Sequence, residues 1–324
     1  MAVPNTSEII TTTIQKRNRK ITKNILDNNA LLFRLKQRGK VKPFSGGNVI
    51  LEELDFAENS TYTRYSGYET LNHAASEVLS SAQYDIKQCA IAVSISGLEE
   101  LQNSGQERMI DLYEARVQNA EDTLSNNFSD DVYSDGTADS SKQIGGLQHI
   151  VADAPSSGTV GSINRASYSF WQNYAYDATT DGGAAATSSN IVKYMNQIWV
   201  NTCRGRDKVD LIVADNNYWK LYLEHAQNIQ RIGNKDMVDA GYDVLKYMSA
   251  DVVLDGGLGG GCPTNHMYFL NTRYLYLRPH SKRNFVPLDP KKRTSVNQDA
   301  AVSYIAWAGN VTCSFARGQG VLKD

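Results

Sequence analysis

The hydrophobic and polar positions in the first quarter of the chain form two strand-like stretches. Residues 49–56 mix aliphatic side chains with three carboxylates, and residues 61–71 space Tyr62, Tyr65 and Tyr68 evenly among small polar residues. The pattern predicts a two-stranded ribbon with a polar bend between its strands. An isolated ribbon is marginally stable in water, because each strand has one partner and little to bury against. The ribbon therefore needs a further surface to pack against.

After the ribbon, the period of the pattern changes from two residues to between three and four. Residues 81–97 alternate in the manner of one long strand, with Ile91, Val93 and Ile95 on one face. Residues 106–128 then carry one apolar stripe at helical spacing, which predicts a helix about 35 Å long, followed by a turn-rich stretch. The stripe consists of Met109, Tyr113, Val117, Ala120, Leu124 and Phe128.

The middle third and the end of the chain predict a mixture of helices and strands. Asp215 or Asn216 is the expected N-cap of one helix, and Gly233 is its expected C-terminal stop. The predicted order is a helix over residues 189–202, a buried strand over 209–215, a helix over 216–233, strands over 250–255 and 266–279, and an alternating strand over 302–322.

The net charge of −2 hides a strong asymmetry along the chain. Residues 1–42 hold ten basic and two acidic side chains, a charge of +8, so the remainder carries −10. A basic arm on an acidic body indicates that the arm docks on acidic protein surface, on nucleic acid, or on both. The alternative is a solvated, partly ordered terminus. The basic residues at the start of the arm are Lys16, Arg17, Arg19, Lys20 and Lys23.

The composition describes an ordinary globular protein of one large or two modest domains. Hydrophobic residues make up 41% and charged residues 21% of the 324 positions. No apolar run approaches the roughly 18 residues of a membrane helix, and the first residues do not resemble a signal peptide. The four cysteines are widely spaced, which favours reduced thiols over disulfides or zinc ligands.

A glycine-rich loop from Gly256 to Gly261 is the strongest candidate for enzyme chemistry. It follows a predicted strand, as a phosphate-binding loop does, but such a loop opens a helix, whereas Pro263 and another strand follow here. Cys262 and His266 are imaginable as metal ligands or as a nucleophile and its base, yet an incidental pairing is the better interpretation. The residues therefore predict no catalytic group, cofactor or metal.

The order of these parts resembles the major capsid proteins of tailed bacteriophages of the Hong Kong 97 type. The likeness lies in the basic arm, the ribbon, the segment "AVSISGLEELQNSG" before the long helix, "GGLQHI" after it, "IVADNNYWKLYLEHAQNIQRIG" in the middle and "SFARGQGVL" at the end. It implies an α+β fold in which "SFARGQGVL" completes the peripheral domain. The implied parts are an N-terminal arm over residues 1–45, an extended loop over 46–80, a peripheral domain over 81–146 and 286–324 with its spine helix at about 106–128, and an axial domain over 147–285.

The resemblance also implies a structural, non-enzymatic function. The chain would be a shell subunit that forms pentamers and hexamers around double-stranded DNA, in a virion assembled in the cytoplasm of a bacterial host. Tyr62, Arg64, Tyr65 and Tyr68 would pack against a neighbouring subunit, since tyrosine is enriched at interfaces; the alternative is packing on their own subunit. The arm would contact subunits or DNA, without sequence specificity.

The resemblance implies further partners, and two other functions compete with the shell subunit. The implied partners are copies of the chain and DNA, with portal, scaffolding and decoration proteins as candidates; the chain starts close to the arm, so a separate scaffold or none is expected. One competing function is an encapsulin-like compartment that encloses cargo enzymes. The other is a nucleotide-dependent enzyme that uses the glycine loop.

Overall fold

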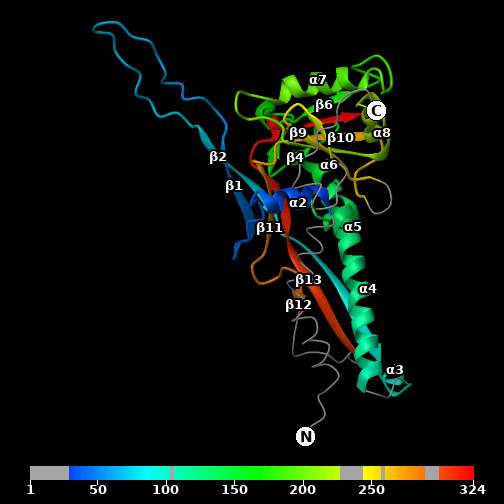
Figure 1. Cartoon of the computed structure of the whole chain (residues 1–324). Helices are drawn as coiled ribbons and strands as arrows, with labels where there is room; N and C mark the ends of the chain where they lie inside the picture. Colours follow the sequence, from blue (N-terminus) through cyan, green and yellow to red (C-terminus); the bar gives the residue numbers. More distant parts are fainter. Residues whose placement is uncertain (1–28, 103–105, 227–243, 257–259, 289–298) are drawn as a thin grey trace.

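The fold contains two large sheets and a long helix, with a two-stranded ribbon that projects from the body (Figure 1). The computed structural model describes residues 29–102, 106–226, 244–256, 260–288 and 299–324. A six-stranded sheet lies at one end of the molecule, and the paired strands β3 and β13 run beside helix α4 toward the other end.

The four-stranded sheet is antiparallel and packs against α4, the predicted spine helix. Val117, Ala120, Leu124 and Phe128 are all buried on the side of this helix that contacts the sheet. The Phe128 ring meets the ring of Trp307 edge to face at a centroid distance of 4.8 Å. The elements are β3 (Lys87–Ser96), β11 (Leu275–Pro279), β12 (Val286–Pro287), β13 (Ala300–Cys313) and α4 (Gln106–Tyr133).

The predicted helix at 106–128 is thus confirmed, and it continues one turn further than expected. The acidic residues after Phe128 had indicated a turn. Val132 and Tyr133 nevertheless extend the apolar stripe and are buried at its end, which favours continuing the helix.

The six-stranded sheet is buried on both faces, which explains the unbroken apolar run in β7. Leu211 and Val213 face the core formed with α2 and α4, whereas Ile212 and Ala214 face α7 and α8. The strand order is β6 (Tyr174–Asp177), β14 (Gly320–Lys323), β10 (His266–Leu270), β7 (Leu211–Ala214), β9 (Ala250–Leu254) and β8 (Val244–Tyr247).

Two predicted helices cover this sheet. α7 (Ile191–Thr202) matches the predicted span closely, and α8 (Asn216–Ala226) begins where predicted. Asp215 is the N-cap of α8, because its side chain accepts a hydrogen bond of 2.9 Å from the Tyr218 N–H. The predicted stop at Gly233 lies outside the described residues.

The ribbon differs from the sequence expectation in its second strand. β1 (Val49–Asp55) pairs with β2 (Leu79–Asp85), and residues 61–71 form no strand. The reason is the spacing of the tyrosines: a strand repeats every second residue, so side chains three apart cannot share one face. The predicted long strand over 81–97 is in fact two strands, β2 and β3, which break at Ile86 and enter different sheets.

The predicted strands at 266–279 and 302–322 are also divided between the two sheets. A turn at Asn271–Tyr274 separates β10 from β11, and a 3-10 turn at Ala316–Gly318 separates β13 from β14. β14 therefore lies between β6 and β10 of the six-stranded sheet, and does not complete the sheet of residues 81–97 as expected. The shorter elements of the described structure include the helices α2 (Ala30–Gln37), α3 (Gly97–Gln102), α5 (Ala138–Ser141) and α6 (Leu147–Ile150), and a hairpin formed by β4 (Thr159–Val160) and β5 (Ile163–Asn164).

Candidate subunit interface

The segment that joins β1 to β2, residues 56–78, projects from the body and is called the ribbon tip here (Figure 1). Tyr62, Tyr65 and Tyr68 lie on the tip with exposed fractions of 80%, 65% and 108%, and Arg64 is exposed between them. In the described structure, the hydrogen bonds of residues 59–76 all close within the tip, as between Ser60 and Ser76. The four predicted interface residues therefore share one segment and do not pack on their own core.

The base of the ribbon, in contrast, is fixed to its own body by apolar packing. Ile50 and Leu54 of β1 and Tyr84 of β2 are buried in a cluster with Val160 and Trp171. The ribbon's need for a surface is thus met at its base by the same chain, which the sequence analysis did not foresee.

Polar contacts fix the same base more firmly. The buried Glu52 carboxylate accepts hydrogen bonds from Arg278 Nε at 2.6 Å and from Thr312 Oγ1 at 2.8 Å. The Tyr84 hydroxyl donates to the Cys313 carbonyl at 2.9 Å. Removing one partner of a buried charged pair leaves the other charge buried and unpaired, which costs free energy. Because breaking these contacts is unfavourable, they fix the direction in which the ribbon leaves the body.

Helix α2 belongs to the body, although the sequence had placed it in the arm. Leu31, Leu32 and Leu35 are fully buried in the core beside α4. Asn29 caps the helix: its Oδ1 accepts the N–H groups of Leu31 and Leu32 at 3.0 and 3.1 Å, and its Nδ2 donates to Ser129 Oγ at 2.7 Å. The predicted arm over residues 1–45 therefore contains a helix that belongs to the body of its own subunit. An Asn cap before leucines at helical spacing was the signal for it.

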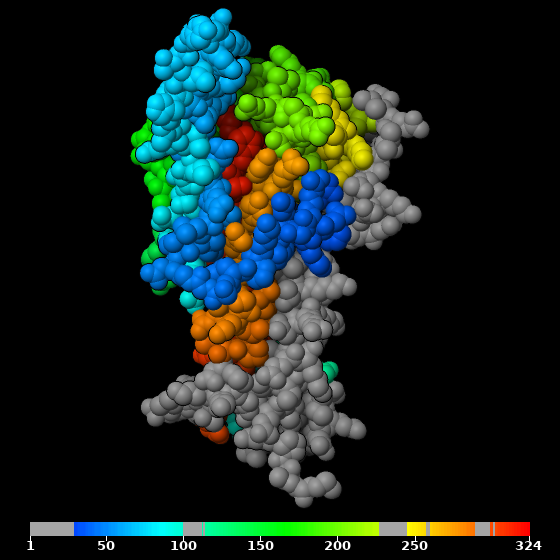
Figure 2. All heavy atoms as spheres, turned by 90° about the vertical axis from the view of Figure 1, so that its left-hand side faces the viewer, coloured from blue at the N-terminus to red at the C-terminus, as the bar shows by residue number. Residues whose placement is uncertain are grey.

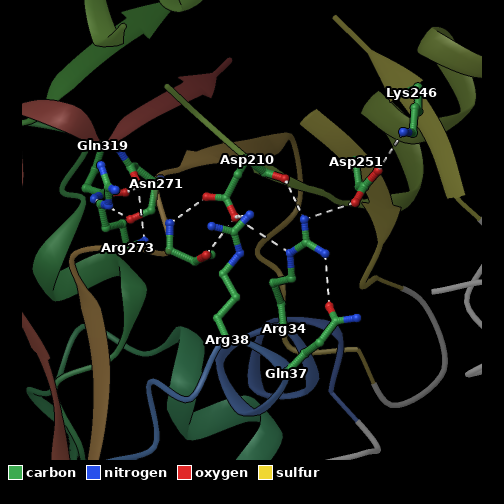
Figure 3. Close-up of polar contacts among 10 residues, drawn as sticks. Arg34, Gln37, Arg38, Asp210, Lys246, Asp251, Asn271, Arg273 and Gln319 are labelled. Carbon is green, nitrogen blue, oxygen red and sulfur yellow. Dashed lines mark hydrogen bonds and ion pairs between the residues drawn. The ribbon is translucent and has the colours of Figure 1, made fainter. Parts of the chain in front are cut away.

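Charged groups join α2 to two adjacent strands of the six-stranded sheet (Figure 3). The Arg34 guanidinium lies 3.1 Å from Asp251 Oδ2 and 3.6 Å from Asp210 Oδ2, and all three residues are buried. Arg38 reaches the same Asp210 carboxylate at 3.0 Å, and Thr272 donates to it through both its N–H and its hydroxyl at 2.7 Å. Arg34 and Arg38, two of the ten basic residues counted in the arm, thus form ion pairs within their own chain. Lys16, Arg17, Arg19, Lys20 and Lys23 lie outside the described residues.

Cys262 and His266 do not face each other as a nucleophile and its base would, and residues 257–259 of the glycine loop lie outside the described residues. The Cys262 Sγ lies 3.8 Å from the carbonyl oxygen of His266, not from its ring, and burial raises the pKa of the Cys262 thiol well above its usual range. The His266 ring instead bonds Asp153 at 3.0 Å. Strand β10 follows the glycine loop, as predicted. Within the described residues, no group of three or more His, Cys, Asp or Glu side chains is placed to hold a metal ion.

None of the helices in the described structure combines the length and the apolarity that crossing a membrane requires.

Comparison with known proteins finds likeness in structure only. No protein-family model matches the sequence, and no curated protein matches it either. The fold is similar to the capsid asymmetric unit of cyanophage A-1(L), with 16% identity and a TM-score of 0.62 over 88% of each chain. It is also similar to structures from mycobacterium phage Bobi, with 10% identity and a TM-score of 0.52 over 88% of this chain and 89% of that one, and from mycobacterium phage Adephagia, with 8% identity and a TM-score of 0.52 over 88% of each. These likenesses show that the chain has the α+β fold of Hong Kong 97-type capsid proteins.

Proposed function

We propose that the chain is the structural subunit of a viral icosahedral shell, which self-assembles into pentamers and hexamers around double-stranded DNA. The observation that carries the proposal is the ribbon tip, which holds three exposed tyrosines away from the body on a rigidly seated base. Exposed aromatic area of this kind is typical of a surface that another protein covers. The likeness to a phage capsid supports a neighbouring copy of the chain as that other protein.

The basic arm is the proposed contact with DNA or with neighbouring subunits. DNA phosphates attract lysine and arginine without regard to sequence, and such binding weakens steeply as salt rises. Replacing Lys16, Arg17, Arg19 and Lys20 by Gln should therefore reproduce at low salt the loss of DNA or of assembly that high salt causes. Portal, scaffolding and decoration proteins are proposed partners in the same virion, assembled in the host cytoplasm.

Electron microscopy with light scattering tests the proposal most directly. The purified chain, with or without co-expressed phage partners, is expected to form closed particles, and nuclease-protected DNA is expected inside them. Closed particles that hold a cargo protein and no DNA would favour the encapsulin-like compartment. A stable monomer of 35.9 kDa whose melting temperature rises with a nucleotide would favour the enzyme.

A further inference from the structure

A cluster of cations surrounds one aromatic ring beside the base of the ribbon. The Nζ atoms of Lys40 and Lys42 lie 4.9 and 5.0 Å from the centre of the Tyr276 ring, and the Arg278 guanidinium carbon lies 5.6 Å from it. The segment after α2 runs alongside β11, with hydrogen bonds on both sides of Leu277, so alternate side chains reach the same face. We call Lys40, Lys42 and Tyr276 the basic-aromatic patch.

Among the described residues, no carboxylate neutralises the two lysines of this patch. Arg278 is paired with Glu52, but in the described structure no carboxylate lies within ion-pair distance of Lys40 or Lys42. Burial lowers the pKa of Lys40, and neighbouring cations, Lys42 first among them, lower it further. Cations gathered around one ring repel one another, so an anion from outside the chain would relieve the repulsion.

The ribbon carries the opposite charge on its outer face. Residues 49–85 contain seven acidic side chains and a single basic one, Arg64. Because side chains alternate along β1, Glu52 points inward to Arg278, whereas Glu53 and Asp55 point outward and are exposed. Within one chain these two carboxylates therefore face away from the patch.

The segment after α2 and the ribbon lie beside each other on one side of the molecule. Figure 2 shows the segment after α2 in blue beside the orange region of β11, next to the lighter blue ribbon. Leu51 and Leu79 flank the carboxylates on the outer face of the ribbon, with exposed fractions of 55% and 75%.

We propose that the basic-aromatic patch binds the outer face of the ribbon of a second copy, with Glu53 and Asp55 of one subunit paired with Lys40 and Lys42 of the next. This inference rests on the proposed function, because assembly is what brings a second ribbon within reach. Protein carboxylates fit better than DNA phosphates, since Leu51 and Leu79 match the Tyr276 ring and the aliphatic stems of the lysines. A contact between two unlike surfaces of the same chain can also repeat around a closed ring.

A charge exchange in the full-length chain tests the pairing. The variant with Lys40→Glu and Lys42→Glu, and the variant with Glu53→Lys and Asp55→Lys, should each assemble poorly, because like charges then meet at every contact. A weakening of about tenfold in one contact repeats at every contact of the shell, so we expect few or no closed particles. The variant with all four substitutions restores opposite charges and should again form particles. Sedimentation and electron microscopy measure the assembled fraction.

Controls separate this inference from the proposed function and from misfolding. Lys142→Glu with Lys208→Glu makes the same change of charge at two other exposed lysines and should leave assembly unchanged. Thermal melting checks that each variant is folded. If the charge-reversed variants unfold, the neutral variant with Lys40→Gln and Lys42→Gln replaces them. This neutral variant should weaken assembly less than the charge-reversed variants do. Normal assembly of either reversed variant, or no recovery in the fourfold variant, would overturn the pairing. If the variant with Lys40→Glu and Lys42→Glu forms normal shells that lack DNA, the pairing is overturned and the patch binds nucleic acid instead. Failure of the unmodified chain to form shells would instead count against the proposed function.

Discussion

Helix α2 and the ribbon tip both lie near the start of the chain and both carry large apolar or aromatic side chains, which are buried in the helix and exposed in the tip. Leu31, Leu32 and Leu35 of α2 are fully buried in the subunit core, whereas Tyr62 and Tyr68 of the tip are at least 80% exposed. The leucines lie on one stripe of a helix, and this stripe packs against the core of the subunit. The tyrosines are spaced by three outside any helix or strand, so their area stays uncovered.

The comparison separates the stability of the subunit from the stability of an assembly. Removing buried area or a buried ion pair from α2 destabilises the folded chain. Removing exposed area from the tip takes nothing from the subunit and can act only where a partner covers that area.

Replacing residues 57–67 by a short Gly-Ser turn should have the largest effect on assembly and almost none on folding. Residues 57–67 of the tip are mainly exposed, so the melting temperature should stay nearly constant. The same change removes Tyr62 and Tyr65 from every subunit, and closed particles should disappear in electron micrographs of the same preparation. A control that replaces the exposed loop residues 156–158 by Gly-Ser should leave both properties unchanged. A variant that melts much earlier, or one that closes normal shells, contradicts this division of roles.

Arg34→Met should give the largest loss of subunit stability on the α2 side. Asp210 and Asp251 are buried, and without the guanidinium each loses a charged partner, which costs roughly 3–5 kcal/mol in comparable cases. Arg38→Ala is the matched control, because Arg38 is largely exposed and its pair with Asp210 is worth about 1 kcal/mol or less. Urea unfolding measures both free energies. Equal losses for the two variants would show that burial of Arg34 does not set its contribution.

The helices could be predicted from the sequence because their signals are local. The stripe of α4 and the Asp215 cap of α8 both lie within a few residues of the elements they define. The partner of β1 could not be found in this way. β2 buries only Ala82 and Tyr84, and it pairs with β1 across the whole ribbon tip. Pairing over such a distance depends on the body that holds both strands, which no local pattern reveals.

The candidate interface shows the same limit. The tyrosines could be named from their spacing and chemistry, although their strand assignment was wrong. Lys40, Lys42 and Tyr276 could not be grouped, because they come from opposite ends of the chain and meet only where the segment after α2 runs beside β11. A single sequence carries no signal for that contact.

Asp255→Asn should change how the free energy of unfolding depends on pH, with a smaller effect than Arg34→Met. Asp255 lies beside the start of α2 and accepts a hydrogen bond from the Ala30 N–H. Burial raises the pKa of Asp255 to about 6, although Tyr133 donates a hydrogen bond to it and the Ala30 N–H at the start of α2 donates another. The folded pKa exceeds the value of about 4 in an unfolded chain, so the folded state favours the protonated carboxyl. Its stabilising contribution is therefore complete below pH 4 and is lost as the pH rises through 6.

The neutral amide introduced by Asp255→Asn should remove that loss, because it carries no charge at any pH in this range and still offers one acceptor oxygen. At pH 7 the variant is expected to be more stable by roughly 3 kcal/mol, and at pH 4 the difference should nearly vanish. Urea unfolding at pH 4, 5, 6 and 7 measures the difference directly. A difference that does not vary with pH would show that Asp255 keeps an ordinary pKa in the folded chain.

The smallest effect on folding is expected for Tyr68→Ala in the ribbon tip. Its side chain is fully exposed, so the free energy of unfolding should change by no more than about 0.5 kcal/mol. Leu32→Ala is the matched truncation on the α2 side and should cost about 2–5 kcal/mol, because it opens a cavity in the core. If a neighbouring copy covers the tip, Tyr68→Ala should nevertheless lower the assembled fraction, while Leu32→Ala at a temperature where it stays folded should not. A Tyr68→Ala variant that unfolds much more easily but assembles normally would show that the tip packs on its own subunit in solution.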